Sequence, residues 1–192
     1  MKRFSKVILF ALSFTIIFTV FNVSKADAFT YKPGDILVTK STSAKGIAGH
    51  SAIVINSTTV LHTSGWKSEP YPLPMSITKW TNRYSTVKVV RPDSAKKGQA
   101  AADAAVKYFK GKTIPYRITS NPRDIDPYTY CSELVWYAYY KAGYPIKYPL
   151  SDQNGIYAWY TPSNGMVYPY DFVNKTIMDN SINSFTIVDN KW

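Results

Sequence analysis

The chain has 192 residues and carries 23 Lys and Arg against 12 Asp and Glu, a net charge of +11. With 45% apolar and 18% charged residues it has a globular composition, which excludes a disordered or collagen-like chain. One Cys and two His exclude an internal disulfide and a Cys-rich zinc site. No metal or organic cofactor is required by the sequence.

The first 28 residues have the pattern of an export signal. Three basic residues precede an apolar run over 7–23, and Ala26-Asp27-Ala28 supplies a small-x-small cleavage site. We therefore predict cleavage after Ala28, a secreted or cell-wall-associated protein, and a single domain over 29–192. An uncleaved membrane anchor is the alternative, although the apolar run is marginal in length for a span.

Removing residues 1–28 leaves 19 basic and 11 acidic side chains, a net charge of +8. Such a surplus suits an anionic cell-surface polymer or lipid headgroups. The basic residues are scattered and form no recognised nucleic-acid-binding motif, so no nucleic-acid partner is predicted. A basic surface that is simply solvated is the alternative.

Short segments rich in β-branched residues predict the strands, in chain order. The segments are 35–39, 50–55, 59–63, 86–91 and a last one near 185–188. The second and third are separated by Asn56-Ser57-Thr58 and predict a hairpin, and the small residues of 41–49 predict a loop.

Two helices are predicted from apolar spacing. In 94–110 the residues Ala102, Ala105, Val106 and Phe109 recur at helical intervals, and 131–142 has a second apolar face. Gly143 ends the second helix, and the chain after Pro145 is rich in loop-forming residues. The predicted fold class is α+β, an antiparallel sheet packed against helices.

Cys131 opens the second predicted helix. Unpaired backbone N–H groups and the helix dipole at that end favour a thiolate, and the same N–H groups can hold an oxyanion. This position therefore suits a nucleophile. The alternative is that Cys131 is only the first apolar residue of a core-facing stripe.

A Cys nucleophile needs a base, and both His residues lie on the predicted hairpin. His50 starts one strand and His62 ends the next. A symmetric two-residue turn would place the two side chains on opposite faces, whereas a longer loop or a β-bulge would place them on one face. The spacing leaves both arrangements open, and two unrelated structural His residues are a third possibility.

Three blocks of sequence resemble a known family. GHSAIVINSTTVLHTS (49–64) resembles the His block of NlpC-like cell-wall cysteine peptidases, and YCSELVWYAYYKAG (130–143) resembles their Cys helix. KTIPY (112–116) resembles the segment that carries an active-site Tyr. The His block precedes the Cys block, as in the permuted YiiX-like papain-like amidases, whose relatives include the lecithin retinol acyltransferase family.

The resemblance implies a circularly permuted papain-like (NlpC-like) fold and a Cys-His-His triad. Cys131 would be the nucleophile, His50 the general base and His62 the group that orients His50. Tyr116 would lie on the oxyanion or substrate side. Glu133 stands where ordinary cell-wall peptidases have Gly, so their substrate subsite is not carried over.

The predicted function is a secreted cysteine hydrolase that cleaves amide bonds, by resemblance in cell-wall peptide, through an acyl-enzyme. One alternative is that the same thiol chemistry acts on lipid, in an acyl hydrolase or acyltransferase of the same fold. Another is a non-catalytic cell-surface binding module that uses the positive charge.

Overall fold

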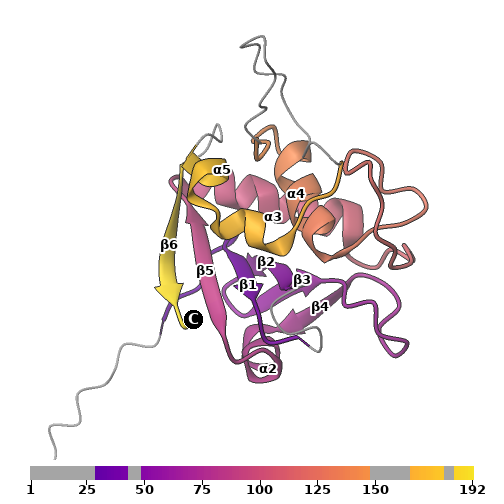
Figure 1. Cartoon of the computed structure of the whole chain (residues 1–192), viewed down its shortest axis with the longest axis horizontal. Helices are drawn as coiled ribbons and strands as arrows, with labels where there is room; N and C mark the ends of the chain where they lie inside the picture. Colours follow the sequence, from indigo (N-terminus) through magenta and orange to yellow (C-terminus); the bar gives the residue numbers. More distant parts are fainter. Residues whose placement is uncertain (1–28, 43–48, 148–164, 180–183) are drawn as a thin grey trace, which may run out of the picture. The chain divides into compact units, whose positions relative to one another are not determined.

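The computed structural model describes residues 29–42, 49–147, 165–179 and 184–192. Within it, Tyr31–Trp192 form one compact unit, a six-stranded sheet packed with helices (Figure 1). The predicted signal peptide (1–28) and most of the predicted loop 41–49 lie outside the described residues.

All neighbouring strands of the sheet run antiparallel, in the order β4-β3-β2-β1-β5-β6. The strands are β1 (Ile36–Thr39), β2 (His50–Asn56), β3 (Thr59–His62), β4 (Leu73–Ser76), β5 (Val87–Pro92) and β6 (Phe185–Asn190). β1 and the first six residues of β2 are buried on both faces, which explains why they are continuous runs of Val, Ile and other small or apolar residues.

Helices cover the sheet and close the core. They are α2 (Ile77–Arg83), α3 (Ala95–Phe109), α4 (Cys131–Lys141), the 3₁₀-helix η2 (Pro169–Val173) and α5 (Lys175–Asp179). α3 and α4 pack against each other and against β2 (Figure 1). The predicted α+β class, with an antiparallel sheet against helices, is confirmed, and this architecture is compatible with a papain-like fold.

The two predicted helices differ in how they are buried. α4 is buried from Cys131 to Tyr139 on every side, because it lies in the middle of the core. α3 buries a face of small residues centred on Gly98, Ala101 and Ala105, so Val106, predicted to be on the buried face, is 38% exposed instead. β4 and α2 were not predicted, since both are short.

In the described ranges, no helix is long and apolar enough to cross a membrane.

Candidate active site

Cys131 is the first residue of α4 and the side chain is 5% exposed. Burial is the main influence on its thiol and raises the pKa, while hydrogen bonds from the Ser51 backbone and from Ser132 act in the opposite direction. The sulfur lies 4.0 Å from Ser132 Oγ, which itself donates to the Val167 carbonyl at 2.7 Å. The resting thiol is therefore neutral, which differs from the thiolate that the helix terminus alone favours.

A β-bulge brings the two imidazoles together. The register of β2 and β3 shifts between Val54 and Asn56, so that Ile53 faces Leu61 and His62 shares a face of the sheet with His50. His50 Nε2 lies 3.1 Å from His62 Nδ1, within hydrogen-bond distance. Of the arrangements that the sequence left open, the structure adopts the bulged one.

Both imidazoles are neutral at physiological pH. Burial is the first cause that holds the pKa of His50 well below its usual value, and His62 and Arg83 add to it. Burial likewise lowers the pKa of His62 to about 4, against the opposing influence of Glu69. A neutral imidazole and a neutral thiol are the protonation states that general-base catalysis requires, in which the proton moves as the sulfur attacks.

Two aromatic rings of the α2 region cover His50. The Trp80 ring stacks on the imidazole with centroids 6.0 Å apart, and the Tyr84 ring lies at 5.0 Å. Tyr84 also interacts electrostatically with Cys131, so His50 and the thiol share this aromatic wall. The Cys131 sulfur accepts a hydrogen bond from the backbone of Ser51, the residue that follows His50 on β2.

An ion pair behind His62 was not predicted from the sequence. Arg83 donates to both oxygens of Glu69 at 2.8 and 2.7 Å, and Ser64 Oγ donates to Glu69 Oε2 at 2.9 Å. The hydrogen bond from Arg83 is the main reason that the pKa of Glu69 is lowered. No motif signals this pair, because its members lie in a loop and in the unpredicted helix α2.

Tyr116 reaches Cys131 from a third part of the chain. Its backbone forms an isolated bridge with Thr129, one residue before the N-cap of α4, and its hydroxyl hydrogen-bonds to the Cys131 side chain. Burial first, and then Cys131, raises the pKa of this phenol. Gly65 makes room for the ring, since a Cβ there would lie 2.8 Å from it and the φ of +71° also favours glycine.

The structure thus gathers the four residues singled out in the sequence into one region. His50 and His62 are hydrogen-bonded to each other, and Tyr116 is hydrogen-bonded to Cys131. Among the described residues, no group of three or more His, Cys, Asp or Glu is arranged to hold a metal ion.

A separate apolar pocket of about 270 Å³ lies between η2, α5 and the β5–β6 edge. Phe172, Met178 and Phe185 line it, with Lys175 and Asp179 among its polar residues. None of the four gathered residues lines this pocket.

Glu133 is fully buried on α4, two residues after Cys131. Burial raises its pKa to about 7, although the Thr119 hydroxyl donates a hydrogen bond to Glu133 Oε1 at 3.1 Å. An acid in the first turn of a helix is favoured by the dipole, but burial dominates here.

Glu133→Gln is expected to change how stability depends on pH. Between pH 4.5 and 7 the folded carboxyl keeps a proton that the unfolded chain releases. The free energy of unfolding of the wild type therefore falls by about 3 kcal/mol as the pH rises across that window. The free energy of unfolding of Glu133→Gln, relative to wild type, should therefore increase by about that amount from pH 4.5 to 7. Urea unfolding at each pH measures it.

His62→Gln is the matched control. Its free energy of unfolding relative to wild type should change with pH in the opposite direction. The pKa of His62 is depressed in the fold, so its contribution to stability is lost as the pH falls from 6.5 towards 4. Glu133→Gln with a pH profile parallel to that of wild type would show that the Glu133 carboxyl is ionised in the fold.

Comparisons with known proteins relate the chain to one family. The family model described as "Lipoprotein N-acylation protein LnsA-like" matches residues 2–170. An "Uncharacterized 30.3 kDa protein" of Bacillus thuringiensis is 32% identical over an alignment of 124 residues that covers 58% of this chain. The chain spans about half, 45%, of the length of that relative. No solved structure matches the chain.

Proposed function

Because the chain belongs to the family of LnsA-like lipoprotein N-acylation proteins, we propose that it is a thiol acyltransferase that moves a fatty acyl group from a phospholipid to an amine. Membership in the family supports an enzyme of the acyl-transfer or hydrolase type, within the range of papain-like and NlpC-like cysteine hydrolases. The lipid-directed alternative is therefore favoured over cleavage of cell-wall peptide. The finer assignment to the YiiX-like branch stays a prediction.

The observation that carries the proposal is the buried pairing of His50 with His62, together with the hydrogen bond from the backbone of the next residue, Ser51, to the thiol of Cys131. With Nε2 of His50 engaged by His62, Nδ1 is the nitrogen left to take the thiol proton. The sulfur then attacks the ester carbonyl of the lipid, and the alcohol leaves with that proton as the thioester forms.

In the second half of the reaction an amine attacks the thioester. His50 accepts the proton of the amine, the amide forms, and the thiol leaves and regains the proton. In this proposal the backbone N–H groups at the start of α4 and the hydroxyl of Tyr116, which interacts with Cys131, donate to the oxyanion of both tetrahedral intermediates.

The burial of the site supports transfer over hydrolysis. Cys131 and His50 are 5% and 6% exposed, and the Trp80 and Tyr84 rings cover the imidazole. A thioester kept from water survives until an amine arrives. We propose the amino group of a lipoprotein as the acceptor, and a location outside the cell once residues 1–28 are removed.

The test is to incubate the protein with phosphatidylglycerol vesicles of one acyl composition and to follow its intact mass. We expect one acyl group on the protein, which a lipopeptide with a free α-amino group then removes as its amide. Peptidoglycan fragments are the parallel substrate. Release of peptides from those fragments, with no acylation by phospholipid, would contradict the proposal and favour the cell-wall peptidase. Binding without either reaction would favour a non-catalytic surface module.

His62→Ala is expected to lower kcat/KM by about 10²-fold, less than loss of the nucleophile or the base, because His62 only orients His50. His62→Asn or His62→Gln should restore part of the activity, since each still offers a polar partner to His50 Nε2. The measurement is kcat/KM on the phospholipid substrate. Wild-type activity of His62→Ala would mean that another residue orients the base.

A further inference from the structure

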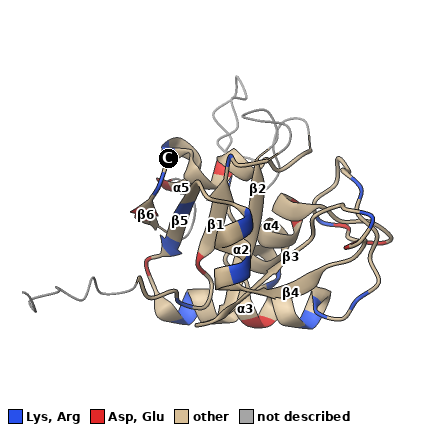
Figure 2. Cartoon of the chain, turned by 90° about the horizontal axis from the view of Figure 1, so that it is seen from below, with Lys and Arg blue, Asp and Glu red and all other residues tan. Residues whose placement is uncertain are grey.

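Large apolar side chains are exposed on two loops beside the candidate active site. Trp66 is 51% exposed and Tyr71 41% on the loop between β3 and β4, and Ile118 is 59% exposed on the loop between α3 and α4. The two loops lie on the same side of the fold in Figures 1 and 2. They meet where Gly65 packs against the ring of Tyr116.

Trp66 is held in its exposed position. The Arg83 guanidinium lies 4.6 Å from the centre of the indole ring, and Arg83 is itself fixed by its two hydrogen bonds to Glu69. The backbone N–H of Trp66 donates to Ser64 Oγ at 3.3 Å, and the backbone carbonyl of Trp66 accepts from the backbone N–H of Glu69 at 2.8 Å. These hydrogen bonds thus hold Trp66 in a turn where about half of the side chain is exposed to solvent rather than packed in the core.

Two of these side chains are close in sequence to residues that link the loops to the thiol. Trp66 follows Gly65, which contacts Tyr116, and the Tyr116 hydroxyl is bonded to Cys131. Ile118 lies two residues after Tyr116. Whatever binds to the exposed side chains is therefore brought close to the reacting sulfur.

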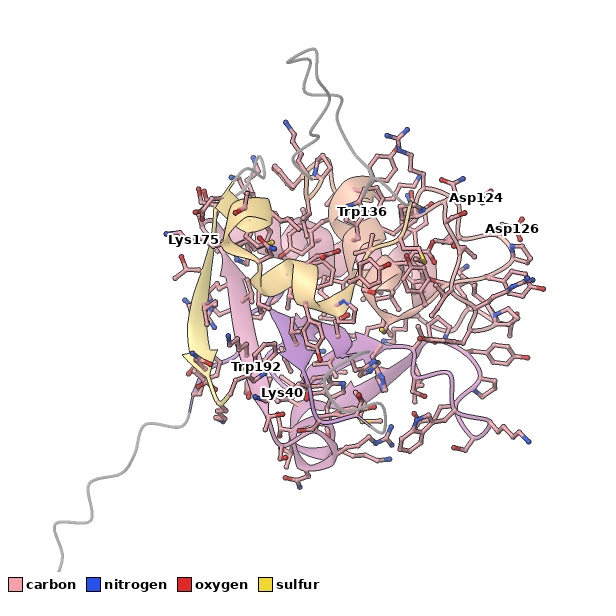
Figure 3. The ribbon with its side chains drawn as sticks, viewed as in Figure 1. Lys40, Asp124, Asp126, Trp136, Lys175 and Trp192 are labelled. Carbon is pink, nitrogen blue, oxygen red and sulfur yellow. The ribbon has the colours of Figure 1, made fainter. Side chains whose placement is uncertain are left out.

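Positive charges accompany the apolar residues. The exposed Lys67 follows Trp66, and the exposed Arg117 precedes Ile118, with its guanidinium 5.0 Å from the Tyr128 ring. Asp124 and Asp126 lie farther along the same loop, at its outer edge in Figure 3. The loop between β3 and β4 also carries the acidic Glu69, which is paired with Arg83.

We propose that Trp66, Lys67, Tyr71, Arg117 and Ile118, the docking face, bind the surface of an anionic phospholipid bilayer. Trp and Tyr are enriched where protein meets the headgroup region, and Lys and Arg beside them attract anionic lipids. Delivery of the acyl donor to Cys131 by this face rests on the proposed function, whereas binding to the bilayer does not.

The experiment uses the full chain with Cys131→Ala, so that no reaction takes place, and vesicles of phosphatidylcholine with or without phosphatidylglycerol. In vesicles with brominated acyl chains we expect the fluorescence of Trp66 to be quenched, and Trp66→Phe to lose that quenching while keeping its binding. Trp66→Ala with Ile118→Ser should weaken partitioning at least about tenfold. Lys67→Gln and Arg117→Gln should each weaken binding to the phosphatidylglycerol vesicles about fivefold.

Matched controls lie on α3, outside the docking face. Val106→Ser removes an aliphatic side chain that is 38% exposed, and Lys96→Gln with Lys107→Gln removes two exposed charges. These variants should partition as the parent does. Every variant shares the same N-terminal segment, so differences among them report on the docking face alone.

The proposal is overturned if Trp66 is not quenched, or if the docking-face and α3 variants bind vesicles equally. It is also overturned if the docking-face variants lose binding only to a membrane protein and not to lipid, which would identify a protein partner. The Trp66→Phe comparison still decides the matter if the double variant fails to fold. Vesicle binding is measured on the Cys131→Ala protein, in which no acyl transfer is expected. Failure of the proposed function would therefore appear in the acylation assay of the wild type and would not change the vesicle-binding result.

Discussion

We expect Cys131→Ala to abolish acyl-enzyme formation and to lower kcat/KM by on the order of 10⁵-fold or more. Cys131 is the single cysteine of the chain, so no other thiol can carry the acyl group. Its sulfur is the atom to which Tyr116 and the Ser51 backbone are hydrogen-bonded. Intact-mass measurement after incubation with phospholipid gives the first result, and turnover of the lipid gives the second.

Neutral hydroxylamine is the control for the chemical nature of the adduct. It cleaves a thioester quickly and an oxygen ester slowly, so it distinguishes acylation at Cys131 from acylation at Ser51 or Ser132, the hydroxyl side chains beside the sulfur. Cys131→Ser keeps the volume of the side chain but supplies a hydroxyl of much higher pKa, and we expect it to be inactive as well. An acylated Cys131→Ala protein would refute thiol catalysis.

His50→Ala is expected to lower kcat/KM by about 10⁴-fold. Burial raises the pKa of the Cys131 thiol, so at neutral pH the sulfur must lose its proton during the attack. Without His50 no base is left beside it, because His62 contacts the thiol only through His50 in the proposed relay. The measurement is the rate of acyl-enzyme formation in single-turnover experiments.

Added imidazole separates the loss of a base from the loss of structure. His50→Ala opens space beside Trp80 and Tyr84, the rings that cover the imidazole in the wild type. Free imidazole should restore part of the rate of His50→Ala and none of the rate of Cys131→Ala. Circular dichroism checks that both variants are folded. Full activity of His50→Ala without imidazole would exclude His50 as the base.

Local patterns were sufficient for the helix that carries Cys131. The predicted helix over 131–142 is observed as Cys131–Lys141, because apolar spacing and the following Gly143 are properties of the local chain. The strand that begins at His50 was predicted for the same reason. The prediction for α3 was right about its bounds and wrong about Val106, since the edge of a buried face depends on what packs against it.

The parts of the site that could not be predicted are those that depend on distant neighbours. Trp80 and Tyr84 cover His50 from α2, a short helix whose place over the sheet depends on tertiary packing. Glu69 and Arg83 are 14 residues apart, and no local spacing rule pairs them. The helix terminus by itself favours a thiolate at Cys131, whereas burial, which depends on distant neighbours, raises the thiol pKa.

The sequence by itself determined the chemical types and the order of the reactive groups, His50, His62 and then Cys131, together with the α+β class. Periodicity and turn chemistry act over a few residues, and that range is enough for these features. Only the tertiary structure decided that a bulge between Val54 and Asn56 sets the two imidazoles 3.1 Å apart. A shift of one residue in register turns a side chain to the other face of a sheet, and nothing in the local sequence controls that choice.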